Sequence, residues 1–302
     1  MNIIKIPSEA KNKRLDIVLA ELLKLPRAQV QQVIKAGNVT LLGNALKASY
    51  KVNGDEEIRY TPLELITSDL TPYDFKLDII YEDEYFVIVN KPAGLVVHPS
   101  YGHKDDTLVN ALIARYKDLS DVNGPFRPGI VHRLDKETSG LLIVCKNNDV
   151  HNKLAALLKK HEITRTYYAL VQGHLHEDAG VIKTYLTRSK ENYQKMANTP
   201  ATGKLAITHF AVKERFHKYM LLKVNLETGR THQIRAHMEY INTPIVGDKL
   251  YGKDNLKLYN KGQLLHAGEL SFKHPITRKE VRFKAPLPPY FNDILNRLRQ
   301  GL

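Results

Sequence analysis

From residue 77 onward, short β-rich runs follow one another with few helices between them, and this order restricts the fold more than any other feature of the chain. Residues 77–81 and 85–89 flank an acidic turn at 82–84, a pattern typical of a hairpin. Further strands are predicted at about 141–146, 167–171 and 219–226, and a helix at about 149–160. Because consecutive strands outnumber helices, we expect an α+β fold with a mostly antiparallel mixed sheet and not a doubly wound one.

A smaller helix-helix-strand unit is predicted before this region. Apolar residues recur at helical spacing on both sides of Pro26, which is placed to start a second helix, and Gly37 is placed to end it. Strands are expected near residues 39–44 and 52–58. The residues predicted to face inward are Leu15, Val18, Leu19, Leu22 and Leu23 on the first helix and Val30, Val33 and Ile34 on the second.

Two domains are expected from this organisation and from the length of 302 residues. We predict a small domain at residues 1–62 and a larger one at residues 76–302. Residues 63–75 contain prolines and no sustained period, which is typical of a linker.

The charge balance indicates an anionic partner. The chain has 45 Lys and Arg against 32 Asp and Glu, a net charge of +13. Residues 1–60 hold ten basic and six acidic residues, a net of +4, so the basic excess extends over both units. Composition leaves nucleic acid, an anionic membrane surface and an acidic protein open as partners.

The compartment is predicted from two further features. The N-terminus lacks the long apolar core of a signal peptide, and charged residues interrupt every later apolar run. Cys145 is the only cysteine, which excludes an intrachain disulfide and a zinc site built from thiolates alone. We therefore expect a protein of the cytoplasm that does not enter a membrane.

Three familiar motifs are present only in incomplete form. Residues 247–254 nearly form a phosphate-binding loop, but Asp254 stands where the motif needs a hydroxyl for Mg²⁺. His232 and His237 are five residues apart, off the four-residue spacing of helical zinc pairs. Ser139 lacks the Gly-x-Ser-x-Gly setting of a hydrolase nucleophile. These patterns favour neither nucleotide hydrolysis, nor a metal site, nor a serine nucleophile.

Two other polar segments are better placed to carry chemistry. Residues 129–140 put mixed charge just before a buried-looking strand, the usual position of a rigidly held functional loop, although a surface turn capped by Asp135 is the alternative. Residues 228–235 run from a strand through a tight turn into a helix with Ile234, Met238 and Ile241 on its apolar face. Arg235 would lie beside that face, where it can pair with a carboxylate from elsewhere in the chain.

These segments resemble the RluA-type pseudouridine synthases. The matching motifs are Asn-Lys-Pro-Ala-Gly-Leu-Val-Val-His-Pro at 90–99, His-Arg-Leu-Asp at 132–135, Arg-Thr-Tyr-Tyr-Ala-Leu-Val-Gln-Gly at 165–173 and Gly-Arg-Thr-His-Gln-Ile-Arg at 229–235. Residues 14–55 are similar to the RNA-binding domain named after small-subunit ribosomal protein S-four. The resemblance covers nearly the whole chain. It implies a catalytic domain with a central cleft that converts RNA uridine to its carbon-linked isomer without a cofactor or a metal.

The resemblance also implies which residues act. Asp135 matches the family's catalytic aspartate, and Arg235 matches the arginine that pairs with it. Tyr167 matches the tyrosine that stacks on the flipped base and assists proton removal from its carbon 5. Arg133 matches the side chain that enters the space left by that base. The same motifs contribute two further expected RNA contacts, His132 and Arg230.

Additional RNA contacts are predicted in the small domain. Arg27, Gln31 and Lys35 are four residues apart and share the face opposite the apolar one. Together with Arg14 they are expected to grip phosphate, and a solvated helix face is the alternative.

Members of this branch with the front domain often modify large-subunit ribosomal RNA. The resemblance therefore favours structured RNA of that kind, free or in an assembling subunit, as the partner of a monomeric enzyme. Transfer RNA stays open as a substrate. Two other classes also stay open: a non-catalytic RNA-binding ribosome-assembly factor, and an RNA-dependent hydrolase such as a glycosidase that works with one carboxylate.

Overall fold

The computed structural model describes residues 2–23, 25, 27–61, 70–100, 102–252 and 257–301. The chain separates into two compact units, Met1–Leu70 with Asp121–Pro128, and Thr71–Ser120 with Gly129–Leu302. The predicted linker at 63–75 lies outside the described residues up to position 69, and its remainder forms neither helix nor strand. Within the described residues, no helix is long and apolar enough to cross a membrane.

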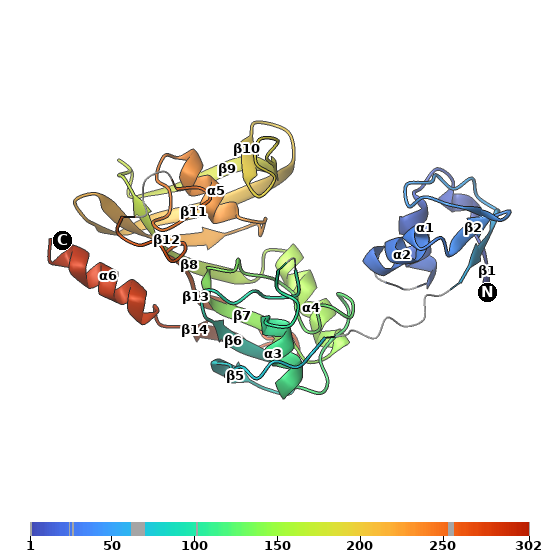
Figure 1. Cartoon of the computed structure of the whole chain (residues 1–302), viewed down its shortest axis with the longest axis horizontal. Coiled ribbons are helices and arrows are strands. Elements are labelled where there is room, and N and C mark those ends of the chain that lie inside the picture. Colours follow the sequence, from blue (N-terminus) through green and yellow to red (C-terminus); the bar gives the residue numbers. More distant parts are fainter. Residues whose placement is uncertain are drawn as a thin grey trace. The chain divides into compact units, whose positions relative to one another are not determined.

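The smaller unit packs two helices on a four-stranded antiparallel sheet (Figure 1). The helices are α1 (Leu15–Leu23) and α2 (Arg27–Lys35), preceded by a short 3-10 turn, η1 (Ser8–Ala10). The strands, in the order β1-β4-β2-β3, are β1 (Asn2–Lys5), β4 (Glu57–Tyr60), β2 (Val39–Leu41) and β3 (Asn44–Ala45). The prediction of a helix-helix-strand module is confirmed.

Most of the inward-facing positions are confirmed, and one is wrong. Five of the eight predicted side chains are at most 2% exposed, Ile34 is 4% exposed and Leu23 packs partly buried against the same core. Leu22 is 40% exposed, because at this end of the helix the core is reached by Leu23, the last residue of α1, and by Leu25 beyond it. Gly37 ends α2 with a positive φ of 79°, while Pro26 lies outside the described residues.

The larger unit is built on one ten-stranded sheet with the order β10-β9-β11-β12-β8-β13-β7-β6-β5, and β14 pairs with β13 (Figure 1). Every described pairing is antiparallel except β13 with β7, so the predicted mostly antiparallel mixed sheet is confirmed. The strands are β5 (Ile79–Glu82), β6 (Phe86–Lys91), β7 (Ser139–Cys145), β8 (Thr164–Gln172), β9 (Ala179–Arg188), β10 (Met196–Thr199), β11 (Lys204–Arg215), β12 (Tyr219–Leu226), β13 (Leu265–Lys273) and β14 (Glu280–Lys284).

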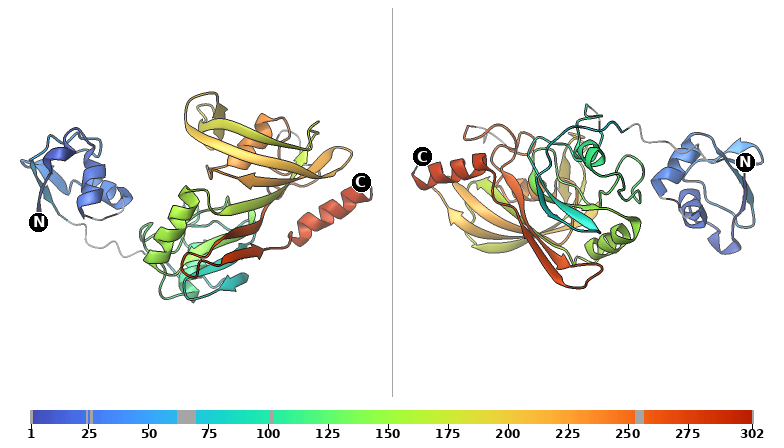
Figure 2. Two further views of the ribbon diagram at one scale, coloured as in Figure 1. Left: turned by 180° about the vertical axis from the view of Figure 1, so that it is seen from behind. Right: turned by 90° about the horizontal axis from the view of Figure 1, so that it is seen from below.

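Four helices accompany this sheet in the described residues: α3 (Leu108–Arg115), α4 (Asn148–Lys159), α5 (Gln233–Tyr240) and α6 (Pro289–Arg299). Helix α4 contacts β7, and α5 contacts β10 and β11 (Figure 2). Separate apolar clusters fill the spaces on the β6-β7 side, beside α6 and beneath α5. The sheet is thus covered by three separate apolar clusters along its length.

Strand β7 anchors the part of the sheet that supports the site. All seven of its residues are buried, as expected for an apolar run with neighbours on both faces. Gly140 has a φ of 113°, and a Cβ at this position would lie 2.2 Å from the carbonyl oxygen of Ala267 on β13. Only glycine permits this close strand contact. The polar loop that precedes β7 is therefore fixed to the middle of the sheet.

Candidate active site

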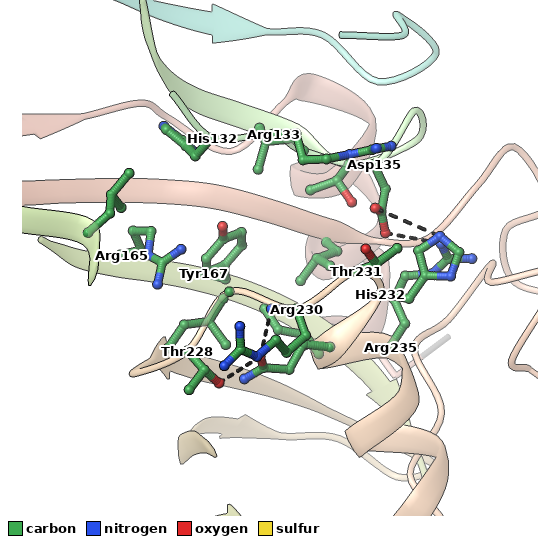
Figure 3. A pocket seen from close by; sticks show the side chains of 18 of the residues that line it. His132, Arg133, Asp135, Arg165, Tyr167, Thr228, Arg230, Thr231, His232 and Arg235 are labelled. Atoms are coloured by element: carbon green, nitrogen blue, oxygen red, sulfur yellow. Dashed lines mark hydrogen bonds and ion pairs between the residues drawn. The ribbon is translucent and has the colours of Figure 1, made fainter. Parts of the chain in front are cut away.

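The central cleft is a cavity of about 450 Å³ in the larger unit, lined by segments far apart in the sequence (Figure 3). One wall is the loop at 131–135, the floor includes β8, and the opposite wall is the segment at 228–235 that leads into α5. The two polar segments singled out in the sequence are thus brought together, and the predicted cleft is confirmed.

Asp135 lies on the loop before β7 and points across the cavity to Arg235 (Figure 3). Its Oδ2 accepts a hydrogen bond from Nη1 of Arg235 at 3.1 Å, and the Asp135 side chain is 17% exposed. The ring Nε2 of His232 lies 3.9 Å from the other carboxylate oxygen. Asp135 is therefore a partly accessible carboxylate in an ion pair, and not only a cap in a surface turn.

Arg235 is held by a second carboxylate that sequence reasoning missed. Its Nε and Nη2 donate to the two oxygens of Asp248 at 2.7 and 2.9 Å, which leaves Nη1 for Asp135. Asp248 is fully buried and also accepts from the backbone N–H groups of Leu250 and Tyr251. Burial alone would lower the pKa of Arg235, but Asp248 and Asp135 raise it above its ordinary value.

The expected position of Arg235 needs correction. We predicted it beside the apolar face of its helix, but Arg235 is only 7% exposed and residues 233–238 are all buried. The helix has partners on more than one side, since Arg235 bonds to Asp248 and His237 bonds to Thr208 on β11 and Thr184 on β9. The two carboxylates offset the charge of this buried guanidinium.

Tyr167 is on β8, opposite Val224 of β12 and Ala267 of β13. The side chain lines the cavity and is 6% exposed. Burial raises the pKa of its hydroxyl, with Asp135 adding to the effect and Arg165 opposing it. Its hydroxyl therefore stays protonated at neutral pH.

The loop at 131–135 has two further anchors. The Nζ of fully buried Lys91 donates to the carbonyl oxygens of Pro92, Leu95 and Lys136 at 2.7, 2.8 and 3.0 Å. His132 accepts a hydrogen bond at Nε2 from the backbone N–H of Ile143 on β7. Burial lowers the pKa of His132 to about 3, so its ring is neutral and suited to accept that bond.

The remaining predicted RNA contacts fall in two places. Arg133 and Arg230 are exposed and line the same cavity as Asp135. Arg230 also donates from Nε to the carbonyl oxygen of Leu205 at 2.9 Å. Lys35 is exposed on α2 in the smaller unit. Their roles in RNA binding stay predictions.

Arg14, Arg27 and Gln31 have an unexpected common partner in the smaller unit. All three donate to the carboxylate of buried Asp16, at distances from 2.6 to 3.1 Å. The Arg14 hydrogen bond, assisted by Gln31 and Arg27, holds the pKa of Asp16 well below its ordinary range. The two arginine side chains are still 39% and 50% exposed, so their outer edges are open to solvent.

Two family models match the chain. The model for RNA pseudouridylate synthases matches residues 85–240, and the model for the S4 domain matches residues 13–58. Residues 85–240 include the loop with Asp135, strand β8 with Tyr167, and helix α5 with Arg235.

Similar proteins span the full chain. A protein of Bacillus subtilis (strain 168) named "Uncharacterized RNA pseudouridine synthase YlyB" is 46% identical over 304 residues, covering 100% of both chains. "Ribosomal large subunit pseudouridine synthase D" of Xylella fastidiosa (strain Temecula1) is 40% identical over 98% of this chain and 92% of its own. The solved structure of human RNA Pseudouridylate Synthase Domain Containing 1 superposes with a TM-score of 0.59, at 25% identity over 75% of this chain and 94% of the human one.

The family models, the full-length relatives and the fold agree with the resemblance carried by the sequence motifs. The chain belongs to the RNA pseudouridine synthases, a family of isomerases, and carries an S4 domain in front of its catalytic domain.

Proposed function

We propose that this enzyme isomerises uridine in large-subunit ribosomal RNA, and that it works as a monomer in the cytoplasm. The substrate class is supported by relatives named for the large ribosomal subunit that align with 98% of this chain, and by the S4 domain in front of the catalytic unit. A single buried cysteine is in keeping with a reducing compartment.

The observation that carries the proposed mechanism is the Asp135–Arg235 pair in a cavity that also contains Tyr167. The target uridine is flipped out of its stack, at an expense of about a few kcal/mol, and Arg133 at the exposed edge of the cavity takes its place. Arginine suits this role because its planar guanidinium can stack and also bond phosphate.

Asp135 then acts on the ribose of the flipped nucleotide. Arg235 keeps the carboxylate ionised and oriented, so it can attack carbon 1′ or take the proton from carbon 2′ to give a glycal. Either step breaks the bond between carbon 1′ and nitrogen 1. The uracil rotates and carbon 5 bonds to carbon 1′; in the first route the bond between Asp135 and carbon 1′ breaks, and in the glycal route Asp135 returns the proton to carbon 2′. The carbon 5 proton then leaves and nitrogen 1 gains a proton.

Tyr167 is proposed to stack on the uracil during this rotation and to assist loss of the carbon 5 proton. Because its hydroxyl is protonated at neutral pH, we infer that it relays the proton and does not act as a phenolate. The matched control is Tyr168, whose hydroxyl donates to Glu269 at 2.9 Å and which does not line the cavity. Tyr167→Phe should slow the late proton step more than RNA binding, whereas equal damage from Tyr168→Phe would indicate a packing role only.

The test of function is release of tritium from RNA labelled at uracil carbon 5. Wild-type enzyme should release tritium from large-subunit RNA and leave the mass of the RNA unchanged. Asp135→Asn should still bind the RNA while releasing tritium on the order of a thousandfold more slowly or not at all. Release from transfer RNA alone would overturn the substrate assignment, abasic sites would indicate a glycosidase, and binding without release by the wild type would favour an assembly factor.

A further inference from the structure

A second buried arginine lies in the same cavity without a counterion. Arg165 on β8 is 8% exposed, about as buried as Arg235, and lines the cavity with Tyr167. Its Nε is buried without a hydrogen-bond partner, and no residue in the described part of the chain forms an ion pair with it. Arg235 carries the same charge and, in contrast, is paired with two carboxylates.

The surroundings of Arg165 are better suited to binding a ligand than to forming an ion pair with another side chain of the protein. A Cβ on Gly229 would lie 2.6 Å from Nη1 of Arg165, so the backbone of the 228–231 wall packs directly on the guanidinium. Lys159 and His161 line the cavity as well, and neither supplies a negative charge. The side chain of Arg165 faces the cavity, into which Tyr167 also projects (Figure 3).

The position on β8 fixes the order of the groups. Arg165 and Tyr167 are two residues apart on one strand, so both side chains leave the same face of the sheet, spaced by about 7 Å. In Figure 3 Tyr167 lies between Arg165 and Asp135. The cavity therefore has a carboxylate at one end and an unpaired cation at the other.

We propose that Arg165 binds a phosphodiester group of the RNA substrate, at the end of the cavity opposite Asp135. This inference rests on the proposed function, because it requires RNA in the cleft. A buried guanidinium is stable only with an anion or several good acceptors, and the phosphodiester is the permanently charged group of RNA. A phosphate can also accept two parallel hydrogen bonds from the guanidinium, whereas a neutral uracil carbonyl would leave the charge uncompensated.

The first test uses the full-length protein without RNA. Because Arg165→Met removes an unpaired buried charge, its urea midpoint should equal or exceed that of the wild type. A clear decrease would assign Arg165 a structural role and overturn the proposal.

The second test measures RNA binding as a function of KCl with a large-subunit RNA fragment. Arg165→Met should weaken binding about tenfold or more, and the slope of log affinity against log salt should become shallower by about 0.7 to 0.9. Arg165→Lys should keep the wild-type slope while losing part of the affinity, because it retains the charge but not the planar fork. The matched control is Arg299→Met, which removes an exposed arginine that is paired with Glu214 at 2.8 Å, and it should leave the slope unchanged.

The third test separates a phosphate contact from a contact with uracil. At saturating RNA, Arg165→Met should keep its single-turnover rate of tritium release within about threefold of the wild type, since a phosphate contact acts mainly on binding. An unchanged salt slope together with a large loss of rate at saturation would show that Arg165 acts on the base, and would overturn the proposal. If the wild type binds the RNA but releases no tritium, the proposed function fails while the salt-slope comparison still tests Arg165.

Discussion

Replacing Asp248 by Asn tests whether the second carboxylate positions Arg235 for its proposed role. Asp248 is fully buried and accepts four hydrogen bonds, two from Arg235 and two from backbone N–H groups. In Asp248→Asn, the remaining oxygen can keep the bonds to the backbone and to Nη2 of Arg235. The new NH₂ group then faces Nε of Arg235, so a donor meets a donor where a bond of 2.7 Å existed.

Two effects of this change can be given a size. Removing one partner of a buried ion pair costs about 3–5 kcal/mol, and we expect the lower end because Asp135 still offsets the charge of Arg235. The loss of a two-point hold lets Nη1 of Arg235 move relative to Asp135, and a shift of about 1 Å at a reacting group lowers the rate about 100-fold. Asp248→Asn should therefore lose about 3 kcal/mol of unfolding free energy and about two orders of magnitude in single-turnover rate.

The assay combines urea unfolding of the full chain with single-turnover tritium release under conditions where each variant is folded. Asp149→Asn is the matched control, because Asp149 is 67% exposed and its ion pair with Lys153 is worth less than about 1 kcal/mol. It should behave like the wild type in both measurements. Wild-type stability and rate in Asp248→Asn would refute the idea that Asp248 positions Arg235.

Three further predictions concern single side chains outside that pair. Asp16→Asn should lower the unfolding free energy of the smaller unit by about 2 kcal/mol, a moderate loss because its two arginine partners are partly exposed. Hydrogen exchange of residues 2–61 in the full chain should then be faster than in the wild type. Unchanged protection of these amides would contradict the prediction. The pKa of His132 is lowered from 6.5 to about 3, so the neutral ring stabilises the fold above pH 6.5 and this contribution is lost as the pH falls towards 3. His132→Gln keeps an acceptor for the N–H of Ile143 but does not titrate. Between pH 6.5 and 3, urea unfolding should therefore show that the variant loses less unfolding free energy than the wild type, by up to about 4 kcal/mol. The same pH profile in both proteins would count against the role of His132. Burial raises the pKa of Cys145 to about 12, so a thiol reagent should label the native protein only as fast as it unfolds; rapid labelling at neutral pH would show that Cys145 is accessible.

Local patterns predicted the elements of this fold well because their signals lie within a few residues. The alternation and turn residues near 77–89 predicted the β5-β6 hairpin, and strand β12 (Tyr219–Leu226) has the predicted bounds. The exposure of Leu22 was missed, because its burial depends on how far the neighbouring elements reach and not on helical spacing.

The site was predictable only where a motif carried it. Asp135, Tyr167 and Arg235 meet in one cavity as the resemblance implied, although no local pattern shows that residues 100 positions apart will pair. Asp248 could not be predicted, because the residues around it resemble an incomplete phosphate loop and an Asp after a Gly does not indicate an arginine partner. Arg165 begins the motif at 165–173 but was given no role, since burial without a partner can be recognised only in three dimensions.

The parallel pairing of β13 with β7 sets a limit on when activity can arise during synthesis. Strand β13 (Leu265–Lys273) joins β7 to β8 and so closes the sheet between the loop of Asp135 and the strand of Tyr167. These contacts span more than a hundred residues, and such non-local pairings form late in folding. A nascent chain that has not yet released residue 273 from the ribosome therefore lacks the strand that joins the loop of Asp135 to the strand of Tyr167, so the cavity can be completed only after that point in translation.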